Sequence, residues 1–277
     1  YIIFEAPEGL QGNEIVFPKI TVTGTKNAMM AAVLAQGQTT ILNAAQEPEV
    51  SDLGICLRSM GACIEGLGTN VLKIQGVSSL KEASHSIMPD RTETGTYILA
   101  AAMTQGDILL QNTRMDFLAL PKKIWQQVGV LITEEAHGYR VTTCPQEKWK
   151  PVDIITEPFP GFPTDLQAQH MALMCCVPGA STVTETIFDN RFMHVAELHR
   201  LGADIHLQGN TATIRGGASL KGAPVMATDL RASVALVLAG LVAEGETTIN
   251  RIYHLDRGYE NIEEKLRACG ADIQRKK

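Results

Sequence analysis

Apolar residues recur at helical spacing in the first quarter of the chain. Val50, Leu53, Leu57 and Met60 are separated by steps of three, four and three residues, and Gly61 follows them directly. Steps of this size place side chains on one face of an α-helix, and a glycine after the last of them is typical of a helix end. The pattern therefore predicts an amphipathic helix over residues 50–60.

The segments around this helix complete a recognisable unit. Residues 25–36 predict an earlier helix, and the β-branched run at residues 39–42 predicts a strand after it. Two further strands are expected beyond Gly61, at residues 62–65 and 71–74, with a Gly-Thr-Asn turn between them. Together with a strand before the first helix, the order is βαβαββ.

The same unit occurs four times. The first helix of each unit ends at a glycine followed by a short β-branched or aliphatic stretch, and these glycines are 66 to 73 residues apart: Gly37, Gly106, Gly179 and Gly245. A second glycine follows 23 to 25 residues later in every unit: Gly61, Gly129, Gly202 and Gly270. Because both glycines recur at nearly constant spacing, we interpret the chain as four copies of one unit before interpreting any single segment. One unit cannot bury both of its faces, so we expect several to pack together with helices inside and sheets outside.

The last unit repeats the apolar stripe of the first. Tyr259, Ile262, Leu266 and Cys269 recur at helical spacing, with Gly270 after them. We therefore expect all four side chains to face the core.

The third unit breaks the stripe. Arg191 and His194 occupy the positions that Val50 and Leu53 hold in the first unit. Polar residues at expected core positions concentrate at functional sites. Two interpretations stay open: either Arg191 belongs to a site, or this helix is rotated and Arg191 lies on a solvated face.

Asp165 stands at the predicted start of another helix. Pro163 and Thr164 precede it, and an apolar run at residues 171–177 follows. An aspartate here usually caps the helix by accepting backbone N–H groups, whereas an ionised carboxylate in a cleft can also serve as a general base. The fourth unit repeats the Asp-Leu-x-Ala motif at Asp229. A helix cap and a general base therefore remain open as interpretations of a position that occurs in two units.

Arginines lie close to several predicted helix starts. Arg231 falls in a first helical turn, Arg91 follows Asp90, and Arg257 precedes the final helix. A cation is unfavourable at a helix N-terminus unless an anion is bound there, so the pattern is compatible with a phosphate and a carboxylate ligand. Each arginine taken alone is equally typical of a solvated surface.

Composition excludes several classes of protein. A net charge of −6 in 277 residues argues against a nucleic acid or an anionic membrane as partner, and 45% hydrophobic with 5% aromatic residues is typical of a globular chain. The longest apolar run, residues 234–243, is too short to span a bilayer. The six cysteines form no CxxC pair, and Cys175-Cys176 is typical of core packing, so we expect a reducing cytoplasm and neither a metal nor an organic cofactor.

Six motifs run in order along the chain: AQEPEVSD (45–52), PDRTETGT (89–96), PTDLQAQ (163–169), FDNRFMHV (188–195), ATDLRAS (227–233) and RIYHLDRGYE (251–260). Together they resemble one family, the UDP-N-acetylglucosamine 1-carboxyvinyltransferases that open peptidoglycan synthesis. The resemblance implies an α/β (α+β) fold, an inside-out α/β barrel of repeated βαβαββ units. It also implies a cytoplasmic enzyme of cell-wall biogenesis, with roles in cell shape and cell division.

The resemblance also implies that the chain is a piece of something longer. It begins at Tyr1 inside a stretch, residues 1–4, that is typical of a strand. Residues 1–88 would be the last repeat unit of an incomplete first domain, and residues 89–277 a second domain of three units. Roughly the N-terminal third of the family would be missing, with its Lys-Asn pair for phosphoenolpyruvate and its mobile loop bearing a proton donor and an arginine.

The family's site residues can be carried over position by position. Asp165 would take the proton of the sugar 3-hydroxyl and contact the sugar nucleotide, while Arg257 would bind the phosphate of phosphoenolpyruvate. Arg191 and Arg231 would bind the carboxylate of phosphoenolpyruvate and take part in closing the cleft. Asp229 would orient Arg231 or assist proton transfer. The sugar nucleotide would further contact five residues, for which ordinary strand packing is the alternative: Lys19, Ile20, Thr21, Val22 and Ile187.

Two other functions remain open from the sequence. One is a binding fragment without activity, and the other is an enzyme like 5-enolpyruvylshikimate-3-phosphate synthase, which shares the repeat architecture. The expected partners are the small molecules UDP-N-acetylglucosamine and phosphoenolpyruvate, with no nucleic acid, membrane or partner protein. RNA 3′-phosphate cyclases share the repeat too, but the acidic balance argues against them.

Overall fold

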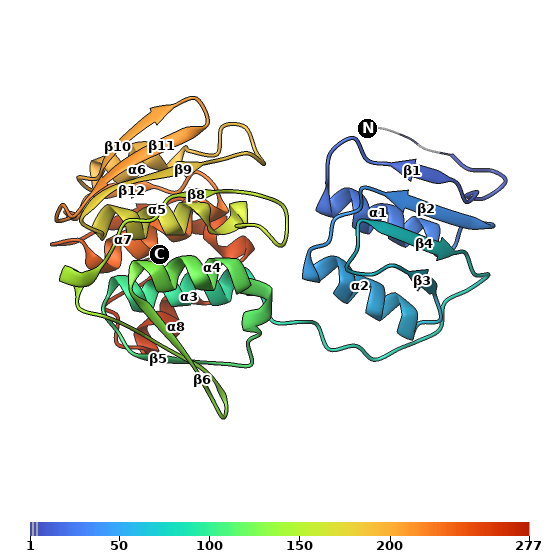
Figure 1. The fold of residues 1–277 in the computed structure, drawn as a ribbon, viewed down its shortest axis with the longest axis horizontal. Helices are drawn as coiled ribbons and strands as arrows, with labels where there is room; N and C mark the ends of the chain where they lie inside the picture. The colour runs from blue at the N-terminus through green and yellow to red at the C-terminus, as the bar shows by residue number, and fades with distance from the viewer. Residues whose placement is uncertain (2, 4, 277) are drawn as a thin grey trace. The chain divides into compact units, whose positions relative to one another are not determined.

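The computed structural model describes Tyr1, Ile3 and residues 5–276, and its contacts divide the chain into two compact units. Unit 1 consists of Tyr1–Met88 and Pro158–Pro160; unit 2 consists of Pro89–Glu157 and the chain from Gly161 onward (Figure 1). The short segment Pro158–Pro160 departs from a continuous division at residue 89. It lies with unit 1, where the backbone N–H of Phe159 donates to Glu47 Oε1 at 3.3 Å.

Unit 1 is one βαβαββ repeat. Its elements are β1 (Glu14–Val16), α1 (Val22–Ala32), β2 (Gln38–Leu42), α2 (Pro48–Ser59), β3 (Cys63–Glu65) and β4 (Val71–Gln75). The sheet order is β1-β2-β4-β3, with β1 parallel to β2 and the other pairs antiparallel. The helices and strands predicted around Gly61 are confirmed, although α1 begins three residues before the predicted helix and ends four residues earlier. Of the strand expected at residues 1–4, Tyr1 and Ile3 have no regular structure, and Ile2 and Phe4 lie outside the described residues.

Unit 2 contains the remaining elements. Its helices are α3 (Arg91–Met103), α4 (Ala119–Val128), α5 (Gln167–Cys176), α6 (His194–Arg200), α7 (Leu230–Val242) and α8 (Ile262–Ala268), with 3-10 turns η1 (Met115–Leu118), η2 (Gln146–Lys148), η3 (Thr164–Leu166) and η4 (Ile252–Arg257). Its strands are β5 (Ile108–Gln111), β6 (Val130–Glu135), β7 (Gly138–Thr143), β8 (Ile154–Ile155), β9 (Gly179–Thr184), β10 (Asp204–Gln208), β11 (Thr211–Gly216), β12 (Pro224–Met226) and β13 (Thr248–Asn250).

The sheets reveal the repeat in their pairing. The sheet β8-β9-β11-β10 has the same order and directions as β1-β2-β4-β3. The sheet β5-β7-β6 lacks the parallel first strand, and the pair β12-β13 has only the parallel one, because residues 271–276 form no strand. The fourfold repeat is thus present, and two of its copies show all six elements.

The glycine that follows each second helix has the backbone conformation that the repeat requires. Gly61, Gly129, Gly202 and Gly270 have φ angles of +101°, +125°, +90° and +98°, a left-handed region where a Cβ is disfavoured. In the last unit Tyr259, Ile262 and Leu266 are buried as expected. The prediction for Cys269 is wrong: α8 ends at Ala268, so this side chain falls beyond the last helical turn and is exposed.

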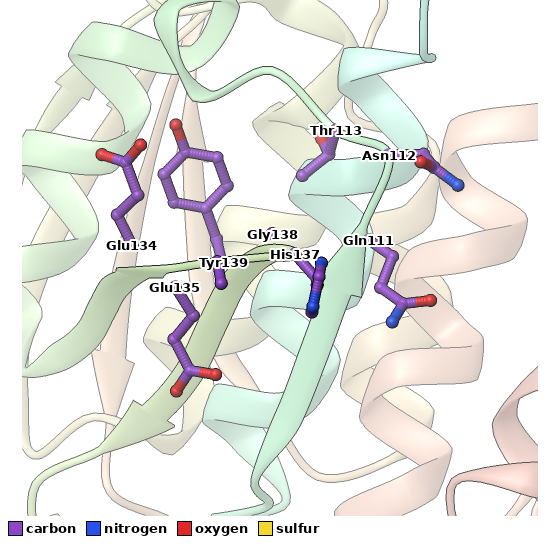
Figure 2. Close-up of a pocket in the computed structure, with 9 residues that line it drawn as sticks. Gln111, Asn112, Thr113, Glu134, Glu135, His137, Gly138 and Tyr139 are labelled. Carbon is purple, nitrogen blue, oxygen red and sulfur yellow. The ribbon is translucent and has the colours of Figure 1, made fainter.

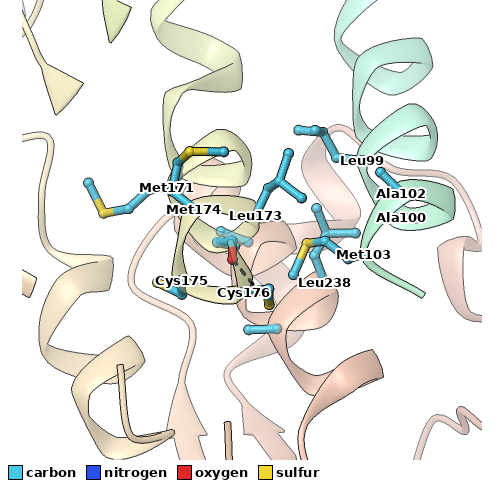
Figure 3. Close-up of a cluster of buried hydrophobic side chains, with 14 of the residues drawn as sticks. Leu99, Ala100, Ala102, Met103, Met171, Leu173, Met174, Cys175, Cys176 and Leu238 are labelled. Carbon is cyan, nitrogen blue, oxygen red and sulfur yellow. Dashed lines mark hydrogen bonds between the residues drawn. The ribbon is translucent and has the colours of Figure 1, made fainter. Parts of the chain in front are cut away.

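The core of unit 2 is built from the first helices of its three repeats. All ten residues of α5 are buried, and α7 is buried from Ala232 to Ala239. The helices α3, α5 and α7 contact one another, and the small side chain of Ala100 and the larger ones of Met103 and Leu173 belong to the cluster that they bury (Figure 3). A helix that is buried on all sides belongs in an interior, and α5 is such a helix.

The cysteines agree with the packing expected from the sequence. All six are free thiols, and Cys175 and Cys176 are buried in this core, where the Cys176 thiol donates to the carbonyl of Ala172 at 3.8 Å (Figure 3). Burial raises the pKa of both thiols.

Among the described residues, no helix combines the length and the apolar character needed to cross a membrane.

Two histidines are buried in unit 2. His170 on α5 and His194 at the start of α6 have relative exposures of 0% and 1%. Burial lowers the pKa of each to about 4, since an imidazolium is poorly solvated inside the protein. The unfolded chain therefore binds more protons than the native state between about pH 6.5 and pH 4. Stability is fully present above pH 6.5 and falls through that window.

We predict that His194→Leu, the residue type found at the matching position Leu53, flattens this loss. Removing one such histidine should reduce the drop in unfolding free energy between pH 7 and pH 4 by at most about 3 kcal/mol. Urea unfolding at several pH values measures it, with the exposed His137→Gln as control. An unchanged pH dependence in His194→Leu would contradict the burial argument.

Candidate active site

Three predicted residues meet at the N-terminal ends of the core helices in unit 2. The carboxylate of Asp165 accepts from Arg191 Nη2 at 2.8 Å through Oδ1, and Arg231 Nη2 lies 3.2 Å from Oδ2. The Asp165 side chain is 41% exposed, whereas those of Arg191 and Arg231 are 21% and 17% exposed. Two largely covered cations thus share one carboxylate that still reaches solvent.

Asp165 does not cap its helix. The capping interpretation is wrong because neither η3 nor α5 has a side-chain cap, and the carboxylate oxygens of Asp165 are taken by the arginines. The first helices of the other units are capped: Asp90 accepts from Thr92 N and Glu93 N, Asp229 from Arg231 N and Ala232 N, and Thr21 from Gly24 N. The third unit alone diverts this side chain from the backbone to a pair of cations.

The arginines set the charge state of Asp165. Burial by itself would favour the neutral acid, but Arg231 and then Arg191 outweigh it and hold the pKa of Asp165 below its usual range. Burial likewise opposes the charge of Arg231, yet the negative charge of Asp165 keeps the pKa of Arg231 raised. At neutral pH the cluster is one carboxylate and two guanidinium groups, with one positive charge in excess.

Arg191 comes from the loop before α6. The sequence placed it inside a helix, but α6 begins only at His194, which frees the loop to turn Arg191 towards Asp165. Its guanidinium also lies 4.9 Å from the ring centroid of Phe188, a cation–π contact that supports its orientation. The alternative of a solvated surface arginine is therefore wrong.

Arg231 is held beside a buried polar network. The Tyr259 hydroxyl lies 2.9 Å from Thr96 Oγ1, and Gln169 Nε2 donates to the backbone carbonyl of Asp165 at 2.9 Å. Burial raises the pKa of Tyr259, although the charge of Arg231 opposes this. The network joins α3, α5 and the segment before α8, so several repeats contribute residues beside the cluster.

Two other predicted residues lie apart from the cluster. Arg257, at the end of η4, is exposed and makes no hydrogen bond or ion pair to the described residues; it lines a pocket with Glu93, Asp256 and Lys265. Asp229 uses its carboxylate to cap α7 through the backbone N–H of Arg231, so it acts on the backbone of Arg231. The structure brings Asp165, Arg191 and Arg231 together and leaves Arg257 separate.

The predicted sugar-nucleotide residues fall on loops and a helix start. In unit 1, Lys19 and Ile20 are exposed, Thr21 caps α1 and Val22 begins it, so strand packing does not explain this segment. In unit 2, Ile187 is 37% exposed and its backbone N–H donates to Glu185 Oε1 at 2.8 Å. Both segments leave side chains accessible to a ligand.

Glu185 was missed by the sequence analysis. It has a relative exposure of 3%, and its carboxylate accepts from the Thr156 and Thr164 hydroxyls at 2.9 and 2.8 Å. A glutamate between two threonines after a β-branched strand carries no pattern that separates it from an exposed residue. Only the fold shows that it is buried.

A second surface hollow lies elsewhere in unit 2. It is lined by the turn between β6 and β7 and the residues after β5, among them Asn112, Glu135 and Tyr139 (Figure 2). None of the predicted site residues lines it. Within the described part of the chain, no three histidine, cysteine, aspartate or glutamate side chains are grouped to hold a metal ion.

Comparison with known proteins identifies the family of this chain. Residues 2–266 match the family model described as EPSP synthase (3-phosphoshikimate 1-carboxyvinyltransferase). The chain belongs to the EPSP synthase family. Within it, the chain is 57% identical over all of its 277 residues to UDP-N-acetylglucosamine 1-carboxyvinyltransferase of Paramagnetospirillum magneticum, and 59% identical over 275 residues to that of Rhodopseudomonas palustris. The resemblance drawn from the six motifs is thus confirmed.

The chain spans 64% of the length of these curated relatives. Among solved structures, the enolpyruvyl transferase NikO from Streptomyces tendae matches with a TM-score of 0.83 and 27% identity, over 91% of this chain and 60% of that one. An EPSP synthase from Acinetobacter baumannii matches with a TM-score of 0.68 and 18% identity, over 94% of this chain and 63% of its own, and shares the fold.

We predict that Arg231→Gln raises the pKa of Asp165 towards its ordinary value, and that Arg191→Gln raises it less, because Arg231 contributes the larger share of the attraction. Carbon NMR titration of the labelled carboxyl group, identified by its loss in Asp165→Asn, measures the change. The exposed Arg200→Gln is the control. Equal titration of Asp165 in all variants would show that the arginines do not set its charge.

Proposed function

We propose that the protein containing this chain transfers the enolpyruvyl group of phosphoenolpyruvate to the 3-hydroxyl of UDP-N-acetylglucosamine and releases phosphate. The observation that carries the proposal is the Asp165 carboxylate, diverted from capping and held between two arginines at a partly exposed position. The relatives named for this reaction match the chain from end to end.

Asp165 is the proposed general base. Enolpyruvyl transfer requires the 3-hydroxyl to lose its proton as its oxygen attacks C2 of phosphoenolpyruvate, while C3 gains a proton and a tetrahedral ketal forms. Loss of a C3 proton and of phosphate then gives the enol ether. An ionised carboxylate within hydrogen-bonding distance of the hydroxyl accepts the first proton.

The arginines are proposed to serve two purposes in turn. Without substrates they are paired with Asp165, which keeps it ionised but makes it a weak base. When the carboxylate of phosphoenolpyruvate enters, Arg191 and Arg231 are drawn to it, and the pKa of Asp165 rises as the pairing weakens. The surplus positive charge of the cluster suits an anionic substrate and ketal.

The remaining predicted residues are assigned supporting roles. Arg257, exposed and outside the cluster, is proposed to bind the phosphate group. Asp229 is proposed to orient Arg231 by capping the turn that carries it, in place of direct proton transfer. Ile187 is proposed to contact the sugar nucleotide, and so are four residues of unit 1: Lys19, Ile20, Thr21 and Val22.

We further propose that unit 1 is the last repeat of a first domain and that unit 2 forms a second domain of three repeats, each domain an inside-out α/β barrel. The buried α3, α5 and α7, with sheets that bury one face, support this arrangement. The six free thiols support a cytoplasmic location, where the product would enter peptidoglycan synthesis and so affect cell shape and division.

We predict that Asp165→Asn in the complete enzyme abolishes turnover, lowering kcat at least about a thousandfold, because the amide cannot accept the proton. The variant should fold with a lowered melting temperature, because two largely covered arginines lose the anion that they share. A phosphate-release assay with UDP-N-acetylglucosamine and phosphoenolpyruvate measures turnover, and thermal unfolding reports the fold.

The matched control is Asp116→Asn, which removes an exposed ion pair with Arg114 and should leave turnover unchanged. Normal phosphate release by Asp165→Asn would refute the assignment. Exchanging the acceptor for shikimate 3-phosphate tests the sister activity, and we expect no release with it. Absence of release by the unmodified complete enzyme with either acceptor would favour a binding role.

A further inference from the structure

Glu185 ties together two segments of unit 2 that carry the reactive cluster. It follows β9, while Thr156 follows β8, the strand parallel to β9. Glu185 Oε1 accepts from Thr156 Oγ1 at 2.9 Å, from Ile187 N at 2.8 Å and from Phe188 N at 3.1 Å. Its Oε2 accepts from Thr164 Oγ1 at 2.8 Å. One side chain thus contacts the strand ends, the loop after β9 and the turn η3.

The arrangement needs a carboxylate. The carboxylate of Glu185 is buried and meets four donors, and an ionised carboxylate is a side chain that accepts on both oxygens without donating. Burying such a charge is unfavourable unless hydrogen bonds replace water, and four of them do so here. The backbone of Glu185 is fixed as well, because Asn210 Nδ2 donates to its carbonyl at 2.9 Å.

Glu185 acts on the cluster through two arms, its hydrogen bond with Thr164 and its hydrogen bond with Phe188. Each arm ends next to a member of the cluster. Thr164 precedes Asp165 directly in the chain, so its hydroxyl holds the turn that presents the carboxylate. Phe188, whose backbone N–H is held by Glu185, places its ring 4.9 Å from the guanidinium of Arg191. The separation between Asp165 and Arg191 therefore depends on both arms.

We propose that Glu185 is a positioning residue that sets the distance between the base Asp165 and the cation Arg191 by holding Thr164 and Phe188 at the same time. The proposal rests on the proposed function for its kinetic consequence, but the positioning itself does not require turnover. Glu185 touches neither the reacting atoms nor the guanidinium groups in this structure.

Several charged and titratable groups surround Asp165, and the test must separate them from Glu185. Arg191 and Arg231 face it directly; Tyr259 and Asp90 act on Arg231, and His194 lies near Arg191. A substitution that leaves all of these unchanged isolates the arm from Glu185. Thr164→Val does so, because it removes one hydroxyl and retains the shape of the side chain.

The test is the titration of the Asp165 carboxyl group in this chain, followed by carbon NMR. In Thr164→Val the turn is released, the ion pair with Arg191 loosens, and the pKa of Asp165 should rise towards its ordinary value. Thr164→Ser keeps the hydroxyl and should restore the unmodified titration. Thr213→Val, on β11 between β10 and β9, is the matched control and should change nothing.

A second variant keeps the test decisive if Thr164→Val does not fold. Glu185→Asp is one methylene shorter and cannot reach Thr164 while holding the loop, so it should shift the titration in the same direction. An unchanged Asp165 titration in whichever of the two variants folds overturns the proposal. An equal shift in Thr164→Ser also overturns it, because packing rather than the hydrogen bond would then be responsible.

Kinetics in the complete enzyme give the functional consequence. Thr164→Val should lower kcat about tenfold to a hundredfold, while KM for UDP-N-acetylglucosamine stays within about twofold, because a misplaced base affects the chemical step more than binding. A changed KM with normal kcat would contradict the role. If the unmodified enzyme shows no turnover, the proposed function fails, and the NMR titration still judges the positioning.

Discussion

The shared carboxylate of Asp165 is the interaction on which the site depends. Two guanidinium groups that are largely covered by protein could not sit side by side without an anion between them, because like charges repel strongly where water is scarce. Asp165 supplies that anion, and its carboxylate still reaches solvent. The cluster is consequently stable when empty and retains one positive charge for an anionic ligand. A substrate that carries both a carboxylate and a phosphate matches this excess.

The repeat explains how such a cluster arises. Every unit places a polar residue at the start of its first helix, and in three units that residue satisfies the backbone: Thr21, Asp90 and Asp229. In the third unit the loop before α6 replaces a turn of helix and delivers Arg191, while the fourth unit supplies Arg231 from the first turn of α7. Asp165 is thereby drawn from its helix to the cations. A departure from the structural pattern of the repeat is what makes the third unit chemically distinct.

Much of the fold follows from local patterns, and the reasons for the exceptions are physical. The stripe ending at Gly61 and the spacing of the marker glycines predicted the helices and the repeat, because periodicity and left-handed glycines are local properties. Cys269 was misplaced because the end of α8 decides its exposure, and helix ends are poorly specified by sequence. Arg191 was recognised as a departure from the stripe, but its loop position and its partner depend on packing between repeats.

Glu185 illustrates what local reasoning cannot find. Its role arises because the ends of two parallel strands and the turn η3 meet in space, and two of its four donors, Thr156 and Thr164, are distant from it in the chain. No periodicity marks a residue of this kind. Asp165, by contrast, was found through its position in a repeated motif, although the sequence favoured a cap and the structure shows an ion pair.

The proposed mechanism requires Asp165 to exchange its arginines for the hydroxyl of the acceptor. The most direct measurement is a crystal structure of the complete enzyme with UDP-N-acetylglucosamine and an unreactive analogue of phosphoenolpyruvate. We expect the Asp165 carboxylate to lie about 2.6–3.2 Å from the sugar 3-hydroxyl, with Arg191 and Arg231 turned to the carboxylate of the analogue. A carboxylate that remains paired with both arginines and does not contact the hydroxyl would contradict it.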